Sequence, residues 1–553
     1  MNKTIRTFAA AALLGISLFS SCTSTNSGSE TVDLIVYNGN VYTVNDNFDK
    51  AEAFAVKDGK IVAVGTTDEI RGNYKASEEL NAEGKTIYPG LIDGHSHFYR
   101  YGLSLQTADL VGTESFKEVV QKVTEQHEKY PDADWIIGRG WDQNDWAVKE
   151  FPTKDTLDQL FPNTPVILTR VDGHAALANQ KALDLAGVTP QTKMVGGLVE
   201  VENGQMTGIL VDNAVDMVSN KIPAPDEAEQ RQALQNAQQN CFAVGLTTIV
   251  DAGLDKATVD LMDAMHQSGD LQMRVYAMLN PTEENKNHYY KSGPYKTDWL
   301  NVRSFKIYSD GALGSRGANL IKPYSDRQGH FGFLLASEQE FREIAAQLNE
   351  HGFQMNTHAI GDSANRLLLD IYGEVLGGKN DKRWRIEHAQ IINPADMQKF
   401  GRYSILPSVQ PTHATSDMYW AGERLGSERI KHAYPFKELL QQNGYMPLGS
   451  DFPVEDINPI FGFHAAVARQ DANNYPDGGF QMENALTREE AIRGMTIWAA
   501  KANFEENEKG SIAPGKFADF IVVDRDLMTV APQEIRALQV LQTYINGKQV
   551  YKK

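Results

Sequence analysis

Hydrophobic and polar positions alternate at both ends of the chain, in the pattern of β-strands. Pairs such as Asn38-Gly39 and Asp58-Gly59 separate some of these runs and indicate hairpin turns. Neither end is long enough to bury a sheet face alone. We therefore expect residues 31–85 and 510–553 to pair into one small composite β-sandwich.

Between the two ends, short apolar runs alternate with amphipathic helical stretches, which is typical of repeated βα units and a parallel sheet. The eight candidate strands are residues 86–97, 246–252, 273–279, 302–309, 354–359, 384–388, 404–409 and 446–450. They predict an α/β fold with a (β/α)8 TIM-type barrel over residues 86–509, and such a barrel needs about 250 residues. The surplus at about 105–240 predicts an inserted subdomain over the barrel mouth.

The first residues have the pattern of a secretory signal. Lys3 and Arg6 precede an apolar run, residues 8–19, that is too short to span a bilayer as a helix. The segment resembles a lipoprotein-type signal peptide over residues 1–21, with Cys22 as the lipidated first residue and residues 22–30 as a tether. This predicts a lipid-anchored protein of the bacterial cell envelope that faces the periplasm or the exterior, touching the membrane only through its anchor. Simple secretion is the alternative.

Composition limits the remaining function classes. Of 553 residues, 41% are hydrophobic and 23% are charged, as in ordinary globular proteins. The formal net charge is −19, which disfavours nucleic-acid binding by net attraction. If Cys22 carries lipid, Cys241 has no partner within the chain, and we interpret it as a buried apolar residue rather than a nucleophile.

Side chains suited to metal binding stand at or just past the ends of candidate strands, where barrel enzymes place catalytic groups. They are His95, His97, Lys306, His358, His388 and Asp451. His95 and His97 are two residues apart and therefore point to the same side of an extended segment. Alternation also predicts that Lys306 and His358 face inward. His388 fits less well, since the same rule turns Arg385 and Glu387 towards the helix layer.

The motifs around these residues resemble the amidohydrolase superfamily, and within it the family 3 branch that includes N-substituted formamide deformylases. They occupy residues 90–98, 305–316, 357–362, 385–390 and 449–453. The resemblance covers about residues 31–553 and implies a metal-dependent barrel hydrolase. It implies that His95 and His97 bind the more buried divalent ion and that His358 and His388 bind the more exposed one. Lys306 would bridge the two as a carboxylated lysine; as an ammonium it would leave a site for one ion.

The resemblance also implies the chemistry. Metal-activated water attacks a carbonyl group, and Asp451 contacts the first metal and passes a proton to the leaving amine. Zinc is the expected metal, with manganese and iron as alternatives.

Substrate-side residues follow from two further segments that resemble the family, residues 138–143 and 170–177. His174 is expected to hydrogen-bond the scissile carbonyl or its oxyanion, or else to be a structural histidine. Trp141 and Asp142 are expected to shape the pocket, with core packing and a capping turn as equal alternatives. Arg316 is expected to meet a substrate carboxylate or to form a structural ion pair.

The sequence thus favours an enzyme that hydrolyses an amide or related C–N bond of a small molecule. A deaminase or a lactone or ester hydrolase of the same superfamily is one alternative. A tethered, non-catalytic ligand-binding barrel is another, because a fold alone does not determine function. The sequence does not determine the oligomeric state.

Overall fold

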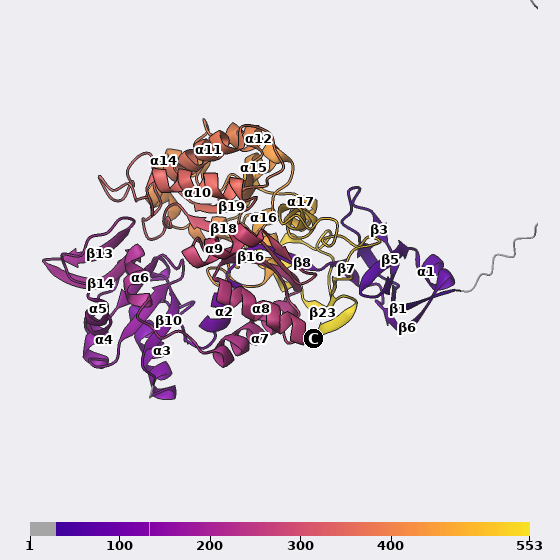
Figure 1. Cartoon of the computed structure of the whole chain (residues 1–553), viewed down its shortest axis with the longest axis horizontal. Helices are drawn as coiled ribbons and strands as arrows, with labels where there is room; N and C mark the ends of the chain where they lie inside the picture. The colour runs from indigo at the N-terminus through magenta and orange to yellow at the C-terminus, as the bar shows by residue number, and fades with distance from the viewer. Residues whose placement is uncertain (1–28, 132) are drawn as a thin grey trace, which may run out of the picture.

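The computed structural model describes residues 29–131 and 133–553. The predicted signal peptide with Lys3, Arg6 and the lipidated Cys22 lies outside these residues. Within the described ranges, none of the helices is both long and apolar enough to cross a membrane. The molecule has three parts, with the sandwich and the insertion at opposite ends of the barrel (Figure 1).

The central part is a barrel of parallel strands, as predicted, but only the second half of the predicted first strand belongs to it, because Thr86–Pro89 forms a strand of the sandwich. Its strands, in spatial order, are β8 (Leu91–Ser96), β15 (Leu246–Leu254), β16 (Arg274–Leu279), β18 (Leu300–Tyr308), β19 (Gln354–Ala359), β20 (Arg385–His388) and β21 (Leu406–Ser408). Residues 446–451 close the gap between β21 and β8. Leu448 forms a parallel bridge with Val409, and its carbonyl accepts from Gly94 N–H at 2.9 Å. The expected eighth strand is therefore a bridge and not a regular strand.

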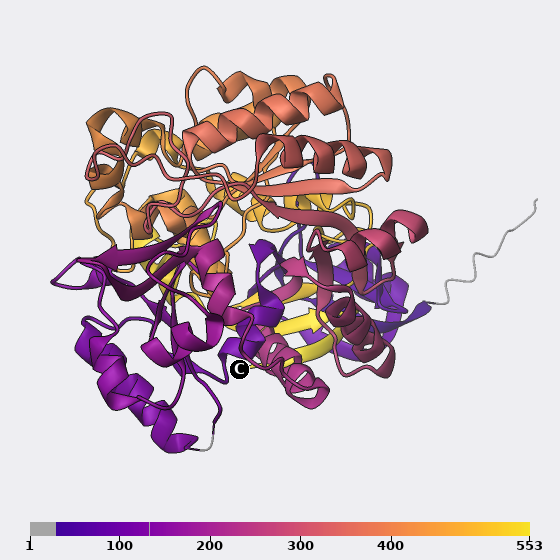
Figure 2. The same ribbon diagram turned by 60° about the vertical axis from the view of Figure 1, so that its left-hand side comes forward.

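Helices surround this barrel, and Figure 2 shows several of them packed side by side along its upper wall. They are α2 (Phe98–Ser104), α7 (Glu227–Ala243), α8 (Lys256–Ser268), α9 (Glu283–Ser292), α10 (Glu338–Glu350), α11 (Asp362–Leu376), α12 (Met397–Tyr403), α13 (Pro411–Asp417), α14 (Ala421–Arg429), α15 (Phe436–Asn443), α16 (Pro459–Ala468), α17 (Arg488–Gly494) and α18 (Ile497–Ala502). Cys241 on α7 is fully buried in the main apolar core, as expected for a small apolar residue.

The sandwich joins the two ends of the chain. One sheet has the order β5 (Lys60–Gly65), β4 (Ala53–Lys57), β1 (Glu30–Tyr37), β6 (Tyr74–Asn81), with α1 (Thr67–Asn73) beside it. The other has the order β24 (Lys548–Lys552), β23 (Val540–Ile545), β22 (Phe520–Val523), β7 (Thr86–Pro89), β2 (Asn40–Tyr42), β3 (Lys50–Ala51). One apolar cluster lies between them, in which Phe520 meets Phe54 at 5.0 Å and Tyr544 at 4.4 Å between ring centroids.

A third sheet forms the insertion between α2 and α7. Its order is β13 (Gly197–Glu202), β14 (Gln205–Asp212), β12 (Ala175–Ala178), β11 (Val166–Arg170), β10 (Ile136–Trp141), β9 (Ala108–Asp109). The helices α3 (Phe116–Lys129), α4 (Asp155–Leu160), α5 (Gln180–Ala186) and α6 (Asn213–Ser219) flank it. Two apolar clusters fill its faces, and Trp141 belongs to one of them. The insertion therefore has its own core and brings β10 and β14 to the barrel mouth.

Candidate metal centre

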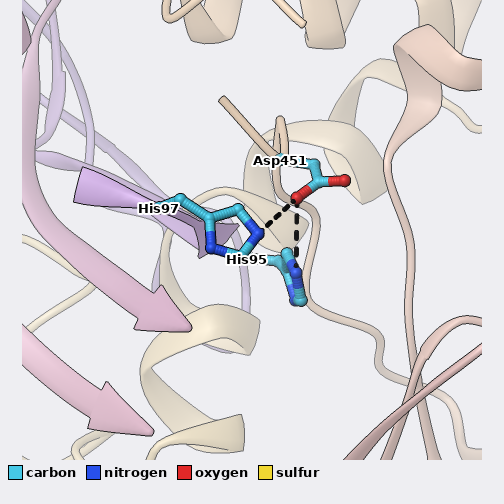
Figure 3. A group of neighbouring side chains, drawn as sticks. All are labelled: His95, His97 and Asp451. Atoms are coloured by element: carbon cyan, nitrogen blue, oxygen red, sulfur yellow. Dashed lines mark ion pairs between the residues drawn. The ribbon is translucent and has the colours of Figure 1, made fainter. Parts of the chain in front are cut away.

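The first and last segments of the barrel meet at a compact group of side chains. The Nε2 atoms of His95 and His97 lie 3.4 and 3.2 Å from Oδ1 of Asp451, and Figure 3 shows both rings turned towards that carboxylate. Potential ligand atoms of the three residues lie within 4.8 Å of one another. Lys306 Nζ, from β18, lies 3.0 Å from His95 Nε2. Residues far apart in sequence thus share one site.

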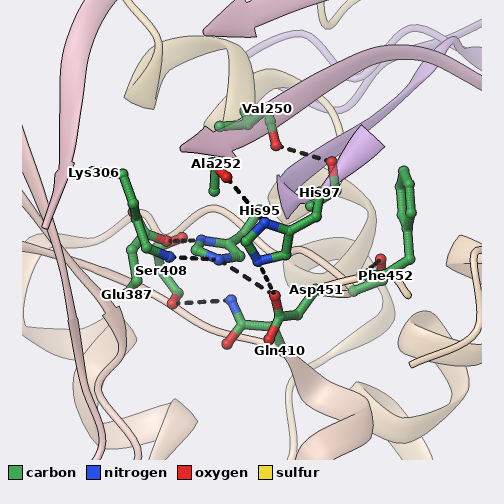
Figure 4. A network of polar contacts seen from close by, with 12 residues as sticks. His95, His97, Val250, Ala252, Lys306, Glu387, Ser408, Gln410, Asp451 and Phe452 are labelled. Atoms are coloured by element: carbon green, nitrogen blue, oxygen red, sulfur yellow. Dashed lines mark hydrogen bonds and ion pairs between the residues drawn. The ribbon is translucent and has the colours of Figure 1, made fainter. Parts of the chain in front are cut away.

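Hydrogen bonds behind the two rings fix which nitrogen faces the site. His95 Nδ1 lies 2.6 Å from Glu387 Oε2, and His97 Nδ1 lies 2.9 Å from the Ala252 carbonyl oxygen (Figure 4). Both acceptors require the proton on Nδ1, so Nε2 keeps its lone pair. The two imidazoles therefore present donor atoms to the same point.

A second group shares the same carboxylate. His388, His413 and Asp451 also offer ligand atoms within 4.8 Å of one another. The His358 ring lies 4.5 Å from that of His388 and 4.9 Å from that of His174, between centroids. His358 Nε2, His388 Nδ1, His413 Nε2 and Asp451 Oδ1 are buried and have no hydrogen-bond partner among the described residues. Buried polar atoms are rarely left unpaired, and imidazole and carboxylate donors aimed at common points suit a divalent cation.

Burial sets the protonation of these ligands. It lowers the pKa of His97 to about 3 and that of His358 and His388 well below the usual value, so the rings are neutral near pH 7. Burial alone would raise the pKa of Asp451, but the His97 ring at 3.2 Å and the neighbouring histidines hold it well below its usual range. Burial also lowers the pKa of Lys306 to about 8. The histidines thus offer neutral nitrogens, and Asp451 offers a carboxylate.

The backbone is unusual where two of these residues sit. His388 has φ 70° and Asp451 has φ 64°, both in the left-handed region that non-glycine residues seldom adopt. Such conformations cost about 1–3 kcal/mol each and cluster at functional sites. In β20 the turn at His388 breaks the alternation, so that its ring enters the barrel next to Glu387. The prediction that Arg385 and Glu387 face the helix layer was wrong.

Arg385 and Glu387 instead form a buried ion pair behind the site. Both side chains are fully buried, and Arg385 Nε donates to Glu387 Oε1 at 2.7 Å. Arg385 Nη2 also donates to the Gly94 carbonyl oxygen at 2.6 Å, which ties β20 to β8. The pair therefore holds the carboxylate that orients His95.

Two cavities, of about 580 and 230 Å³, flank the centre, and His174 lines both. His174 Nδ1 lies 2.6 Å from Asp212 Oδ1. Burial opposes the charged ring, but Asp212 outweighs it and raises the pKa of His174. The smaller cavity also contains Asp142, which forms an ion pair with Arg170 and accepts from Asn144 N–H at 2.8 Å.

Trp141 and Arg316, which were predicted to contact the substrate, line neither cavity. Trp141 is 1% exposed in the core of the insertion, where its Nε1 donates to the Leu168 carbonyl oxygen at 2.7 Å, so the core-packing alternative describes it. Arg316 pairs with Asp326 at 2.9 Å and lines neither cavity, so the ion-pair alternative describes it.

Three functional residues of the centre were not predicted from the sequence: His413, Glu387 and Asp212. His413 follows the predicted strand 404–409 by four positions, and a wider window at strand ends would have included it. Glu387 is adjacent to His388, but the alternation rule placed it outside. No local signal marks Asp212.

Comparison with known proteins agrees with this geometry. Residues 78–551 match the family model described as "Amidohydrolase family". The chain belongs to the amidohydrolase family. An N-substituted formamide deformylase of Arthrobacter pascens is 28% identical over 93% of this chain and 97% of that protein. Protein LONG AFTER FAR-RED 3 of Arabidopsis thaliana is 33% identical, over 94% and 91% respectively.

A solved structure is similar as well. A metal-dependent hydrolase of Pyrococcus horikoshii has a TM-score of 0.73 and 26% identity, covering 90% of this chain and 99% of that one. The prediction of a metal-dependent hydrolase of the amidohydrolase family, acting on C–N bonds other than peptide bonds, is confirmed at the level of the family.

Proposed function

We propose that the protein hydrolyses an amide or related C–N bond of a small molecule, with one or two zinc ions held by His95, His97, Lys306, His358, His388 and Asp451. The convergence of these six side chains from five segments of the barrel carries the proposal. The two ligand groups that share Asp451 support a site for two ions. The lowered pKa of Lys306, about 8, makes its neutral amine accessible for carboxylation, which would supply a bridging ligand.

The protein's own groups have distinct tasks in this reaction. A divalent ion, when bound, makes water more acidic and polarises a carbonyl group. Asp451 is ionised and takes the proton from the attacking water, then delivers it to the leaving nitrogen. His174, held by Asp212 through Nδ1, presents Nε2 to the cavities and donates to the carbonyl oxygen as negative charge develops there.

Elemental analysis and a substrate panel test the proposal together. The panel contains N-acyl amines, formamides, cyclic amides and lactones, and release of amine or ammonia distinguishes amide hydrolysis from deamination. His95→Ala and Asp451→Asn should lose activity, whereas His288→Ala, an exposed histidine on α9, should retain it. Full activity in metal-free protein, or in both site variants, would refute the proposal.

We also propose that Cys22 carries a lipid that anchors the enzyme in a bacterial cell envelope. The support is the sequence of residues 1–30. Metabolic labelling with an alkyne fatty acid should mark the wild-type chain but not Cys22→Ser. Equal labelling, or equal membrane association of both chains, would contradict the anchor.

A further inference from the structure

The larger of the two cavities contains two arginines that form no ion pair with a carboxylate of the described residues. Its wall includes His97 and His174, and also Arg100, Arg139 and Tyr308. Arg100 lies on α2, three residues after His97, and Arg139 lies on β10 of the insertion. Tyr308 ends β18, two residues after Lys306. The barrel and the insertion thus bring three hydrogen-bond donors to one cavity.

These donors lack protein acceptors that would balance them. Across residues 29–131 and 133–553, neither Arg100 nor Arg139 has a carboxylate oxygen within 4.0 Å of its guanidinium nitrogens. Arg139 Nη2 donates to the Val171 carbonyl oxygen at 2.9 Å, but its buried Nε has no partner among those residues. The Tyr308 hydroxyl is also buried and unpaired there. Arg100 is exposed, so water can solvate its guanidinium group. Leaving the buried Arg139 Nε and Tyr308 hydroxyl unpaired is costly, so these two groups are suited to an acceptor from outside the chain.

The carboxylates of the same cavity form no direct ion pair with the two arginines, although the charge of Arg100 opposes the rise in the pKa of Asp216 that burial causes. Glu340 and Glu343 also line the cavity, where Glu340 accepts from Ser337 and Glu343 accepts from Gln339. Asp212 is engaged by His174, and Asp172 by Arg170. Asp216 lines the cavity, but no nitrogen of either arginine lies within 4.0 Å of it, by the same criterion. Burial, with the charge of Arg100, lowers the pKa of Arg139 to about 10, against the opposing attraction of Asp451 and Asp172.

The smaller cavity has the opposite character. Asp145, Asp417 and Glu455 line it, together with the indole of Trp420. Asp451 also lines this cavity, and its Oδ2 lies 3.8 Å from His413 Nε2. A nitrogen that receives its proton from Asp451 therefore leaves on the side of these acidic groups and the aromatic face. Burial raises the pKa of Asp417 to about 7 and that of Glu455 to about 8, and an ammonium product would favour the ionised form of both groups.

We propose that Arg100, Arg139 and Tyr308 form a subsite for a carboxylate carried by the acyl half of the substrate. The amine half then occupies the acidic cavity. The preferred substrates are monoamides of small dicarboxylic acids. The inference rests on the proposed amide hydrolysis and specifies which half of the amide carries the charge.

Matched substrates test the subsite. N-benzyl monoamides of succinic, glutaric and adipic acid are compared with neutral analogues in which a methyl ketone replaces the carboxylic acid, by release of benzylamine. Charge-assisted hydrogen bonds to two arginines predict a preference of about 10–100-fold in kcat/KM for at least one acid. Arg100→Gln, Arg139→Gln and Tyr308→Phe should each reduce this ratio. Arg231→Gln, a surface arginine on α7 that pairs with Glu227, should not.

The results separate the subsite from the proposed function. Equal rates for acids and ketones, or a ratio unchanged in Arg100→Gln, would overturn the subsite while leaving amide hydrolysis intact. So would an Arg100-dependent preference for N-acetyl amino acids, whose carboxylate lies on the amine half. If no amide is cleaved, the proposed function fails, and calorimetric titration with glutarate still tests the subsite. Binding should weaken at least about 10-fold in Arg100→Gln and Tyr308→Phe, and equal binding would overturn it.

Discussion

Replacing Glu387 by glutamine should lower both the free energy of unfolding and the affinity for metal. The Glu387 carboxylate accepts from His95 Nδ1 at 2.6 Å and from Arg385 Nε at 2.7 Å, and all three side chains are fully buried. The variant keeps the shape but leaves Arg385 without a counter-charge, because its other acceptors are neutral. Breaking a buried pair costs about 3–5 kcal/mol. Losing the carboxylate behind a metal-ligating histidine lowers metal affinity about 10–100-fold.

A second buried pair provides the matched control. Arg274 and Asp519, 0% and 5% exposed, join at 2.6 Å where the barrel meets the sandwich. Asp519→Asn should therefore lower the free energy of unfolding by a similar amount without changing metal affinity. Urea unfolding of metal-free protein gives the first quantity, and competition with a chelator gives the second. If Glu387→Gln weakens metal binding no more than Asp519→Asn does, Glu387 does not orient His95 for the ion.

The remaining predictions concern ligands and pH. Asp451→Asn should lower kcat about 10²–10⁴-fold at saturating metal, as expected for loss of a proton-transfer group, and steady-state kinetics would show a smaller loss if the carboxylate has no such role. Lys306→Ala should be inactive and regain activity with added acetate or propionate, whereas absence of rescue would contradict a bridging carboxylate. His413→Ala should weaken cobalt binding in a spectroscopic titration, and an unchanged titration would exclude it as a ligand. Arg385 and His95 outweigh burial and lower the pKa of Glu387 to about 2, so its stabilising contribution is complete above pH about 4.3 and is lost as pH falls towards 2. The difference in free energy of unfolding between the wild type and Glu387→Gln should therefore be the same at pH 6 and at pH 8, and it should become smaller below pH 4.

Periodicity predicted the barrel because short strand-like runs alternate with amphipathic helical stretches, and seven of these runs form strands that are buried almost throughout. It could not show that the eighth segment forms an isolated bridge, between Leu448 and Val409, in place of a regular strand. Pro447 has no N–H to donate, and the N–H of Leu448 goes to the Gly494 carbonyl oxygen instead of a neighbouring strand.

The candidate site was predictable only where alternation holds. Lys306 and His358 obey it, and the structure places them at the centre as expected. His388 enters the barrel through a left-handed backbone turn, which no pattern of residue types reveals. The positions of the Trp141 and Arg316 side chains depend on how the insertion and the loops at the barrel mouth pack. This packing is a property of tertiary structure that the local sequence does not reveal.

The closure of the barrel through residues 446–451 has a consequence for the order in which the protein is made. His95 and His97 emerge early from the ribosome, but Asp451 follows more than 350 residues later. Its N–H then donates to the His95 carbonyl oxygen at 2.8 Å, so the same contact that seals the barrel completes the cage. A nascent chain has no such cage until this late segment is in place. An ion held by this cage would therefore be acquired only during maturation of the finished polypeptide.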